Sequence, residues 1–313
     1  MIIAVLDTGV DLTHPELKDK LVPGATFIEG TSTAQDDNGH GTEVAGVAAA
    51  LTNDEAGIAG VRPRVRIMPV KVATAGGHTD DADGNPRVAA GIRWAVDHGA
   101  NVIAFSLAVG DNANMRDAVA YAYRHNVLLV AASGNSGTHS SPYPAPAYFP
   151  HVLAVGGTDN HGHRQSYSSY GMKDLVMAPS VDVPTTHLGG GCGTGGFTSI
   201  AAPQVAGLAA LLLSVRPGLS VDQLIALIEG GADPIEGQEG WDRKVGYGRV
   251  NAYRSLQLAL AMPAALASVL LSTGTQIDNT SGQRDSLTSP NAPPEQRSVP
   301  APSSDLPDLR DVG

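Results

Sequence analysis

Three polar residues stand where apolar segments begin or end, and their types could support nucleophilic chemistry. Asp7 ends the run IIAVL, His40 opens the small-residue segment HGTEVAGVAAAL, and Ser199 precedes the uncharged run IAAPQVAG. A serine can attack a carbonyl carbon when an imidazole takes its proton and a carboxylate fixes the tautomer of that imidazole. Asp, His and Ser in this chain order therefore indicate a candidate acyl-transfer site.

Each of these residues also has a simpler interpretation. Ser199 could do no more than cap the helix that follows it. Asp7 could open a turn with Thr8 and Gly9, or accept a phosphoryl group, although Gly9 stands where dehalogenase-like phosphotransferases carry a second acid. A lone histidine such as His40 is more often a satisfied polar group than a catalyst. The three residues alone leave these alternatives open.

Alternating elements must position these residues. Short apolar segments, rich in β-branched residues, predict buried strands over 2–6, 65–72, 101–106, 127–132, 152–156 and 175–178. Helical patterns cover 40–51, 87–98, 116–125, 199–214, 221–229 and 251–260. The alternation predicts an α/β fold of three layers, with helices on both faces of a mainly parallel sheet. Sites in such folds lie at the carboxyl ends of strands, where Asp7 stands.

The segment 201–213 has no charged residue and is apolar on every face, which predicts a helix buried all round. We expect Ser199 at its N-terminus and Pro203 in its first turn, where a proline is tolerated. Unpaired N–H groups and the positive end of the helix dipole favour negative charge there. A nucleophile would be well placed at this helix end.

The composition of this chain limits both its core and its partners. Of the 313 residues, 42% are hydrophobic and 4% are aromatic, and the chain contains 37 glycines. The core must therefore use close backbone approach more than large side chains. A formal net charge of -11 argues against nucleic acid or an anionic membrane as a partner. The single cysteine, Cys192, excludes an internal disulfide, and we expect it to be a small packing residue rather than a reactive thiol.

The composition shifts after about residue 262. We expect a domain over 1–262 and a disordered tail over 263–313, rich in Ser and Pro. The uncharged segment 255–271 is near the lower length limit for a membrane span, but Pro263 interrupts it, so we expect a terminal helix instead. The N-terminus shows no basic region, long apolar region or cleavage site of a secretion signal.

Several segments together resemble one protein family. LDTGVDLTHPEL, NGHGTEVAG and TSIAAPQVAG look like the three signature segments of the subtilisin-like serine proteases, the subtilases, in that family's order. VIAFSLA looks like the family's substrate-pairing segment and LVAASGNSG like its oxyanion-hole segment. The resemblance extends over roughly residues 1 to 262 and outweighs the separate simpler interpretations.

The resemblance implies roles for individual residues. Ser199 resembles the nucleophile, His40 the general acid and base, and Asp7 the acid that orients it. Asn135 resembles the side-chain donor of the oxyanion hole, with the backbone N–H of Ser199 as the second donor. The implied reaction is hydrolysis of peptide bonds in polypeptide substrates through an acyl-enzyme, with no cofactor in the chemistry.

Substrate binding would be a β-pairing, in which an extended peptide adds to exposed strand edges. By resemblance, Ser106, Leu107 and Ala108 form one such edge. The wall of the primary pocket would come from residues 131–134 and from around 142–147, and it includes Ala131, Ser133 and Gly134. No acidic residue in these segments argues for cleavage after Lys or Arg, so we expect a broad or apolar preference.

Several residues depart from the family pattern. Phe197 stands where glycine is usual, so it could strain the backbone, obstruct the cleft, or line the pocket beside the leaving group. Ala108 and Val109 also replace glycines and could narrow the subsites before the scissile bond. Glu43 and Gln204 replace common histidines and look like tolerated variants.

The segment that usually precedes the first core strand, and the propeptide, are absent from this sequence. Their absence weakens the expectation of a structural calcium ion, because the family's N-terminal ligand is missing. Glu16 and Asn53, with the loop 51–55, resemble parts of that calcium site. The stretch 81–85 is rich in oxygen ligands but lacks the rest of a calcium loop.

The sequence therefore predicts a monomeric serine endopeptidase. The rival is a catalytically impaired pseudoprotease, or a truncated subtilase, that binds peptides without cleaving them; Phe197 favours it. An esterase of the α/β-hydrolase type is disfavoured, because Ser199 lacks the G-x-S-x-G turn and the chain order differs. Subtilases are usually secreted, but the sequence alone predicts no location.

Overall fold

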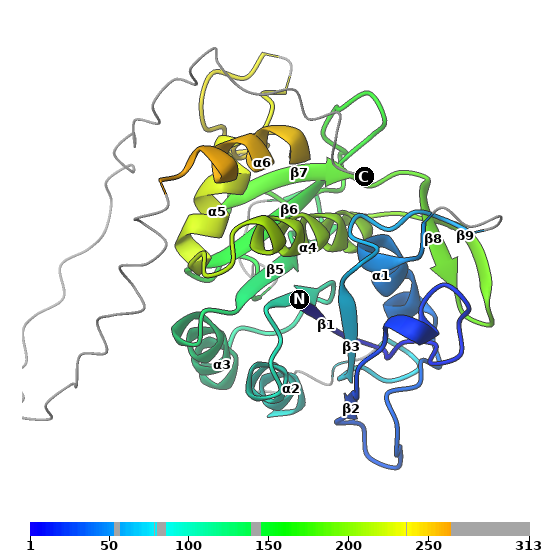
Figure 1. Cartoon of the computed structure of the whole chain (residues 1–313). Helices are drawn as coiled ribbons and strands as arrows, with labels where there is room; N and C mark the ends of the chain where they lie inside the picture. Colours follow the sequence, from blue (N-terminus) through cyan, green and yellow to red (C-terminus); the bar gives the residue numbers. More distant parts are fainter. Residues whose placement is uncertain (53–56, 78, 80–85, 139–144, 236, 264–313) are drawn as a thin grey trace, which may run out of the picture. The chain divides into compact units, whose positions relative to one another are not determined.

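A seven-stranded parallel sheet forms the centre of the computed structural model, which describes residues 1–52, 57–77, 79, 86–138, 145–235 and 237–263 (Figure 1). In spatial order its strands are β2 (Ala25–Thr26), β3 (Arg66–Lys71), β1 (Ile2–Asp7), β4 (Val102–Phe105), β5 (Leu128–Ala132), β6 (Val152–Thr158) and β7 (Leu175–Pro179). Each of the six expected strands is present, and the predicted α/β fold is confirmed.

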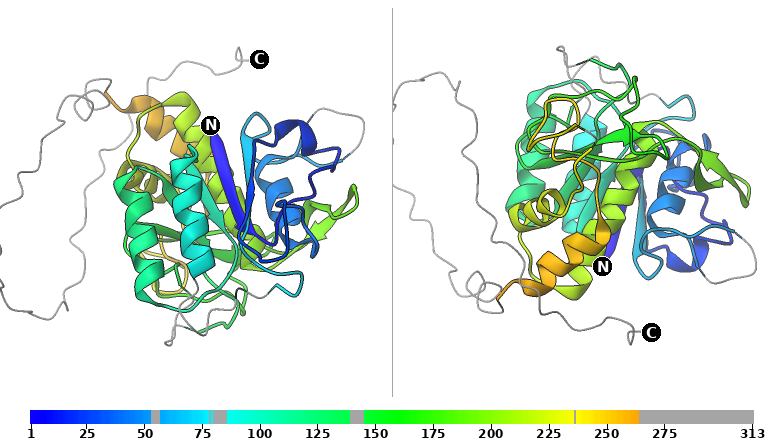
Figure 2. Two further views of the ribbon diagram at one scale, coloured as in Figure 1. Left: turned by 90° about the horizontal axis from the view of Figure 1, so that it is seen from below. Right: turned by 90° about the horizontal axis from the view of Figure 1, so that it is seen from above.

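Helices cover both faces of this sheet and bury two separate apolar cores. On one face lie α1 (His40–Ala49), α4 (Thr198–Val215), α5 (Val221–Gly230) and α6 (Ala252–Ala261). On the other lie α2 (Pro86–Asp97) and α3 (Ala113–Arg124), which Figure 2 shows side by side. Successive strand residues point to opposite faces, so Ile3 joins the first core and Ala4 the second.

The strand register brings the carboxyl ends of the central strands to one edge. Asp7 is opposite Lys71 on β3, Leu6 is opposite Phe105 on β4, and Phe105 is opposite Ala131 on β5. The residues that follow β4 and β5 therefore lie on the same edge as Asp7. The fold gathers the candidate residues at the edge where parallel sheets carry their sites.

An antiparallel hairpin of β8 (Val183–His187) and β9 (Gly191–Gly195) packs against α1 and was not among the expected elements. Thr185 Oγ1 donates to the Glu43 carbonyl at 2.6 Å, and Thr186 Oγ1 donates to the Thr42 carbonyl at 2.7 Å. Its sequence, VPTTHLGGGCGTG, lacks both β-branched density and alternation in its second half. Contacts with α1, rather than local preference, therefore define this hairpin.

Helix α4 is the buried helix that its uniformly apolar sequence predicts. Its length and composition alone would let it cross a membrane, but 72% of it is buried within the domain, as in the core helix of a globular protein. The helix begins at Thr198 and not at Ser199, so Pro203 is its sixth residue. The expectation of Pro203 in the first turn was wrong. Because proline has no N–H, the Ser199 carbonyl four residues earlier lacks its usual intrahelical donor.

Helix α6 ends at Ala261, and Met262 takes an extended conformation before Pro263, as the residue before a proline prefers. The Arg216 guanidinium donates to the carbonyls of Ala259, Leu260 and Met262, three orphan acceptors at this helix end. Residues 264–313 lie outside the described part of the chain, so the predicted tail stays a prediction.

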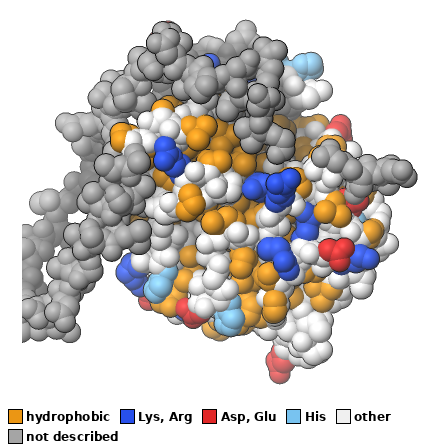
Figure 3. Space-filling model, in the orientation of Figure 1, with side chains coloured by type: hydrophobic (Ala, Val, Ile, Leu, Met, Phe, Trp, Pro, Cys, Tyr) orange, Lys and Arg blue, Asp and Glu red, His pale blue; other side chains and the backbone are white. Residues whose placement is uncertain are grey.

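Positively charged side chains on the face shown in Figure 3 lie apart from one another. Lys and Arg side chains lie among apolar and uncharged ones rather than in one continuous basic area. This view covers one face only, and the expectation that nucleic acid is not a partner stays a prediction.

Candidate active site

Asp7 and His40 form a hydrogen-bonded ion pair at the carboxyl end of β1. His40 Nδ1 lies 2.7 Å from Asp7 Oδ1; Asp7 is fully buried and the His40 side chain is 29% exposed. A carboxylate can only accept, so Nδ1 carries the proton in this bond. The other ring nitrogen, Nε2, is then the basic one in the neutral imidazole.

The buried carboxylate of Asp36 holds the start of α1 against the end of β1. One of its oxygens accepts from Thr8 Oγ1 at 2.9 Å and from the N–H groups of Asn38 and Gly39, each at 3.0 Å. The other oxygen accepts from the Thr42 N–H at 3.0 Å and from its hydroxyl at 2.6 Å. Asp36 thereby satisfies N–H groups before and in the first turn of α1, which begins with His40.

Thr8 joins the two catalytic candidates through its own atoms. Its N–H donates to Asp7 Oδ1 at 2.8 Å, and its hydroxyl oxygen accepts from the Gly41 N–H at 3.0 Å. The backbones approach so closely that a Cβ on Gly41 would lie 2.0 Å from the Gly9 carbonyl oxygen. Glycine at position 41 is therefore required for this close approach.

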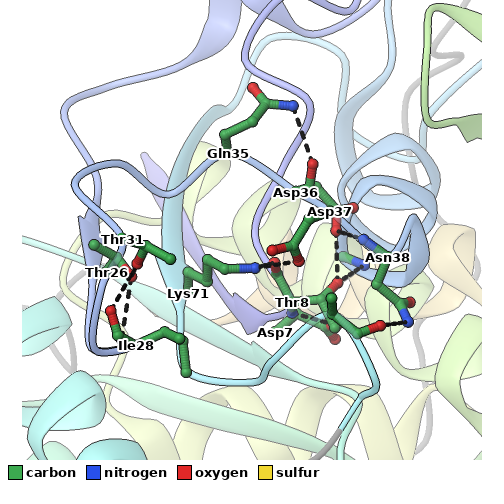
Figure 4. Close-up of polar contacts among 12 residues, drawn as sticks. Asp7, Thr8, Thr26, Ile28, Thr31, Gln35, Asp36, Asp37, Asn38 and Lys71 are labelled. Carbon is green, nitrogen blue, oxygen red and sulfur yellow. Dashed lines mark hydrogen bonds and ion pairs between the residues drawn. The ribbon is translucent and has the colours of Figure 1, made fainter.

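Lys71 lies behind this turn with its side chain 1% exposed. Its ammonium donates to the Thr8 carbonyl at 2.5 Å and to Asp37 Oδ1 at 2.6 Å (Figure 4). A buried ammonium needs both a countercharge and hydrogen-bond acceptors, and these two groups supply them. The turn at Thr8, directly after β1, is therefore held by both Asp36 and Lys71.

Electrostatics in this half of the site favour positive charge on His40 and negative charge on Asp36. The charge of Asp7 raises the pKa of His40 to about 9, against the opposing effect of burial. Burial acts to raise the pKa of Asp36, but the hydrogen bonds from Thr42, Gly39, Asn38 and Thr8 outweigh it and hold that pKa below its usual value. The folded structure therefore favours protonated His40 and ionised Asp36.

Ser199 is the second residue of α4 and is hydrogen-bonded to the chain that leaves β4. Its hydroxyl donates to the Ser106 carbonyl at 3.2 Å, and the Ser106 hydroxyl donates to the Ser199 carbonyl at 2.7 Å. Pro203 has no N–H with which to bind that carbonyl four residues earlier, so Ser106 supplies the missing donor. Ser106 thus fixes the backbone of Ser199.

Ser199 and His40 are not hydrogen-bonded to each other in the described part of the chain. Within the described ranges, Ser199 Oγ is bound to Ser106 and not to His40. Such bonds are often absent without substrate and form in the complex.

Asn135 lies beside the start of α4. Its side-chain oxygen accepts from the Thr198 N–H at 3.1 Å and from the Thr198 hydroxyl at 2.8 Å. This fixes the amide orientation, because the oxygen is committed to Thr198 and the NH₂ group is turned away from it. The Ser199 N–H belongs to the first turn, whose donors have no intrahelical acceptor. Two donors are therefore available near Ser199.

The expected substrate-binding residues divide by exposure. Leu107 is half-buried and Ala108 exposed, whereas Ala131 and Ser133 are fully buried and Gly134 is half-buried with a φ of 95°. Val109 is buried and exchanges two backbone hydrogen bonds of 3.2 Å with Ala145. Its side chain belongs to the second apolar core, and its expected effect on a substrate subsite stays a prediction. Residues 142–144 of the expected pocket wall lie outside the described residues.

The remaining departures from the family pattern have visible surroundings. Gln204 donates to the Pro179 carbonyl at 2.6 Å, and Glu43 lies 3.8 Å from His187 Nε2, so both replacements have polar partners. Cys192 is exposed on β9, so the expectation of a packing residue was wrong. Phe197 is exposed and takes up a positive φ.

Of the two residues expected at a calcium site, Glu16 and Asn53, the structure describes Glu16. Glu16 is buried, and a Cβ on Gly57 would lie 2.1 Å from its Oε1, so its carboxylate packs closely against Gly57. Asn53, most of that loop, and 81–85 fall outside the described residues. In the described part of the chain, no group of three or more His, Cys, Asp or Glu side chains could hold a metal ion.

The sequence did not identify Asp36, Thr8 or Lys71 as parts of this site. Asp36 precedes Asn38-Gly39 directly before a helix, which is a recognisable capping signal. Lys71 carries no such signal, because only the pairing of β3 with β1 places it beside Asp7.

Comparisons with known proteins identify the family of this chain. The family model described as "Subtilase family" matches residues 1–248. Thermitase from Thermoactinomyces vulgaris is 42% identical over 258 residues, covering 82% of this chain and 88% of thermitase. Subtilisin Savinase from Lederbergia lenta is 39% identical over 251 residues, covering 80% and 88% of the two chains.

A solved structure shows the same fold. The crystal structure of a cold adapted subtilisin-like serine proteinase matches with a TM-score of 0.69 and 30% identity, covering 80% of this chain and 89% of the other. The resemblance stated from the sequence is thus confirmed. The chain belongs to the subtilase family and is a serine-type endopeptidase.

Proposed function

We propose that this endopeptidase cleaves peptide bonds through an acyl-enzyme formed on Ser199. His40 Nε2 takes the hydroxyl proton as Ser199 Oγ attacks the scissile carbonyl carbon, and then gives that proton to the leaving amine. A water molecule reverses the sequence and releases the acid product. Asp7 holds the imidazole tautomer and stabilises the imidazolium that forms in each half of the reaction.

The observation that carries this proposal is the 2.7 Å bond between His40 Nδ1 and the fully buried Asp7. A buried carboxylate at this distance orients the ring and leaves Nε2 as the base. A structural histidine would not need a carboxylate partner taken out of water, because burying that charge is costly. The pair therefore supports a catalytic role more than a structural one.

The oxyanion would be bound by the Asn135 amide and the Ser199 N–H. Thr198 holds the Asn135 oxygen at 2.8 and 3.1 Å, so the donor is oriented before substrate arrives. Preorganised donors are most effective because no reorganisation is needed during the reaction.

The substrates of a protease are polypeptides, and we assign their acyl side to the edge formed by 106–108. Ala108 is exposed there, and the Ser106 side chain is occupied with Ser199. Backbone pairing along such an edge is largely independent of side chains, which agrees with a broad preference.

Every proton and electron pair in this scheme belongs to the chain, the substrate or water, so the scheme draws on no cofactor. A structural calcium ion near Glu16, and a monomeric state, stay predictions.

Labelling with a fluorophosphonate probe tests the proposal directly, because an activated serine displaces fluoride from the probe and becomes phosphonylated. We expect stoichiometric labelling of the folded wild type and none of Ser199→Ala. Ser214→Ala is the matched control in the same helix, since its hydroxyl only binds the Leu211 carbonyl at 2.6 Å. It should label like the wild type.

The rival function, a pseudoprotease that binds peptides without cleaving them, predicts a different result. A folded wild type that neither labels nor hydrolyses a peptide ester would overturn the acyl-enzyme proposal and favour that rival. Asn135→Ala adds a second readout, because loss of one oxyanion donor should lower kcat on the order of 100-fold.

A further inference from the structure

Phe197 occupies a backbone conformation that suits glycine, two residues before Ser199. Its φ is 63° and its ψ is 178°, and it is the N-cap of α4. This region of backbone space is almost restricted to glycine, because a Cβ there crowds the adjoining peptide groups. Phe197 is therefore a strained residue beside the nucleophile.

Phe197 buries little of its surface among the residues that the structure describes. Phe197 is 56% exposed, and its ring contacts that of Tyr167 at a centroid distance of 4.9 Å and an angle of 56°. A glycine here would relieve the strain and lose little burial. A strained aromatic residue that remains exposed beside a catalytic serine points to a contact with something outside the chain.

The two rings are held in place by Ser180. Its carbonyl accepts from the Phe197 N–H and from the Tyr167 hydroxyl, both at 2.9 Å, and its side-chain oxygen lies 2.7 Å from that hydroxyl. The Tyr167 carbonyl in turn accepts from the Gly137 N–H at 2.6 Å, in the loop that carries Asn135. The aromatic pair is therefore fixed to both the start of α4 and the oxyanion loop.

The pair lies on a defined side of Ser199. Ser106, which binds Ser199 from one side, follows β4, whereas Ser180, which binds Phe197, follows β7. Strands β5 and β6 separate β4 from β7 in the sheet. A peptide whose acyl part pairs with 106–108 must leave Ser199 toward the other side. The residues after the scissile bond then pass the aromatic pair.

We propose that Phe197, supported by Tyr167, is a specificity-determining residue for the leaving-group side of the substrate. Its ring would pack against the side chain that directly follows the scissile bond and favour a large apolar or aromatic residue over glycine. The inference rests on the proposed acyl-enzyme function. It assigns binding, rather than obstruction, to this departure from the family pattern.

Acyl transfer to added amines measures this side of the site alone. An amino acid amide attacks the acyl carbon, the new C–N bond forms as the bond to Ser199 Oγ breaks, and the amine proton passes through His40 to Oγ. Water competes for the same acyl-enzyme and gives the acid. The ratio of amide to acid product, from one peptide ester, therefore reports how well the amine binds, independently of acylation.

The experiment compares leucinamide and phenylalaninamide with glycinamide as acceptors. We expect the wild type to prefer the two large amines by at least about tenfold, as a hydrophobic contact allows. Phe197→Ala removes the ring but keeps a Cβ, and Phe197→Gly removes both. Both variants should lose most of this preference, by about fivefold or more.

A matched control separates this effect from a general loss of aromatic surface. Tyr253 is 59% exposed on α6, and Tyr253→Ala should keep the wild-type ratio. A preference retained within twofold in both Phe197 variants would overturn the inference. So would a rise in transfer to all three amines, since that result indicates obstruction.

Failure of the proposed function gives a different result. If the wild type neither labels with the fluorophosphonate nor hydrolyses the ester, no acyl-enzyme forms, and both proposals are overturned. If it hydrolyses the ester but the Phe197 variants partition as it does, only the role of Phe197 is overturned.

Discussion

The two halves of the site are held by different interactions. Asp7 and His40 lie in a network of buried charges, in which Thr8 binds both Asp36 and Lys71, and Asp36 binds the start of α1. Ser199 lies at the start of α4, where neutral hydrogen bonds and an unusual backbone conformation set its place. The first half depends on ionisation, whereas the second depends on which residues can adopt the required backbone.

This difference has a consequence for how each half responds to change. Removing a carboxylate from the charged half leaves buried donors unsatisfied, which is costly. Removing the strained side chain from the other half relieves an unfavourable conformation. Removing a carboxylate from the charged half should therefore lower the free energy of unfolding, whereas removing the strained side chain from the other half should raise it.

The largest effect is expected on catalysis for Asp7→Asn. An amide cannot hold His40 in the required tautomer or stabilise its charged form, so kcat should fall on the order of 10,000-fold. Peptide-ester hydrolysis measures this loss, with circular dichroism as the check on folding. A variant that retains a tenth of wild-type kcat would show that Asp7 is not the orienting acid.

The same substitution should change the pH dependence. The charge of Asp7 raises the pKa of His40 to about 9, above its ordinary value of 6.5. The stabilisation gained from protonated His40 is then complete below pH 6.5 and is lost as the pH rises through about 9. Catalysis needs the neutral ring, so kcat/KM should rise over that range.

Asp7→Asn should move this midpoint downward, because the charge that raises the pKa is gone. A profile of kcat/KM against pH for both proteins tests the shift. A wild-type midpoint at or below 6.5 would contradict the electrostatic account.

A stability effect of intermediate size is expected for Asp36→Ala. It leaves the donors of Thr8, Asn38, Gly39 and Thr42 without their carboxylate, so the free energy of unfolding should fall by about 3 kcal/mol. Urea unfolding measures the change. Asp117→Ala, on the exposed side of α3, is the control and should have little effect.

The sign of the pH effect follows from the lowered pKa of Asp36. Its contribution is present above the ordinary value of 3.8 and disappears as the pH falls through the lower folded value. Wild type and Asp36→Ala should therefore become more alike in acid. A difference that grows toward acid pH would refute the assignment.

The smallest effect is a gain in stability for Phe197→Gly. Relief of the positive φ should outweigh the greater chain entropy of glycine and raise the free energy of unfolding by about 1 kcal/mol. Phe197→Ala keeps a Cβ at the strained position and should show no such gain. Equal stability of the two variants would mean that the conformation carries no strain.

The sequence was sufficient to predict the strands and helices that carry the site. Uniformly apolar segments such as 2–6 and 152–156 form strands, because only burial on both faces tolerates them. Asp7, His40 and Ser199 were recognised because they stand at the ends of such elements within family-like segments. The glycine-rich hairpin of β8 and β9 was missed, because its conformation comes from contacts with α1.

The tertiary structure alone decided how those residues are held. Strand pairing places Lys71 beside Asp7, and the reciprocal bonds between Ser106 and Ser199 join residues 93 positions apart. Local preference cannot specify such contacts, because they depend on where distant segments meet. The exposed, strained Phe197 was a departure in the sequence; the fold alone shows that its ring lies beside Tyr167 and that its N–H donates to Ser180, the residue that follows β7.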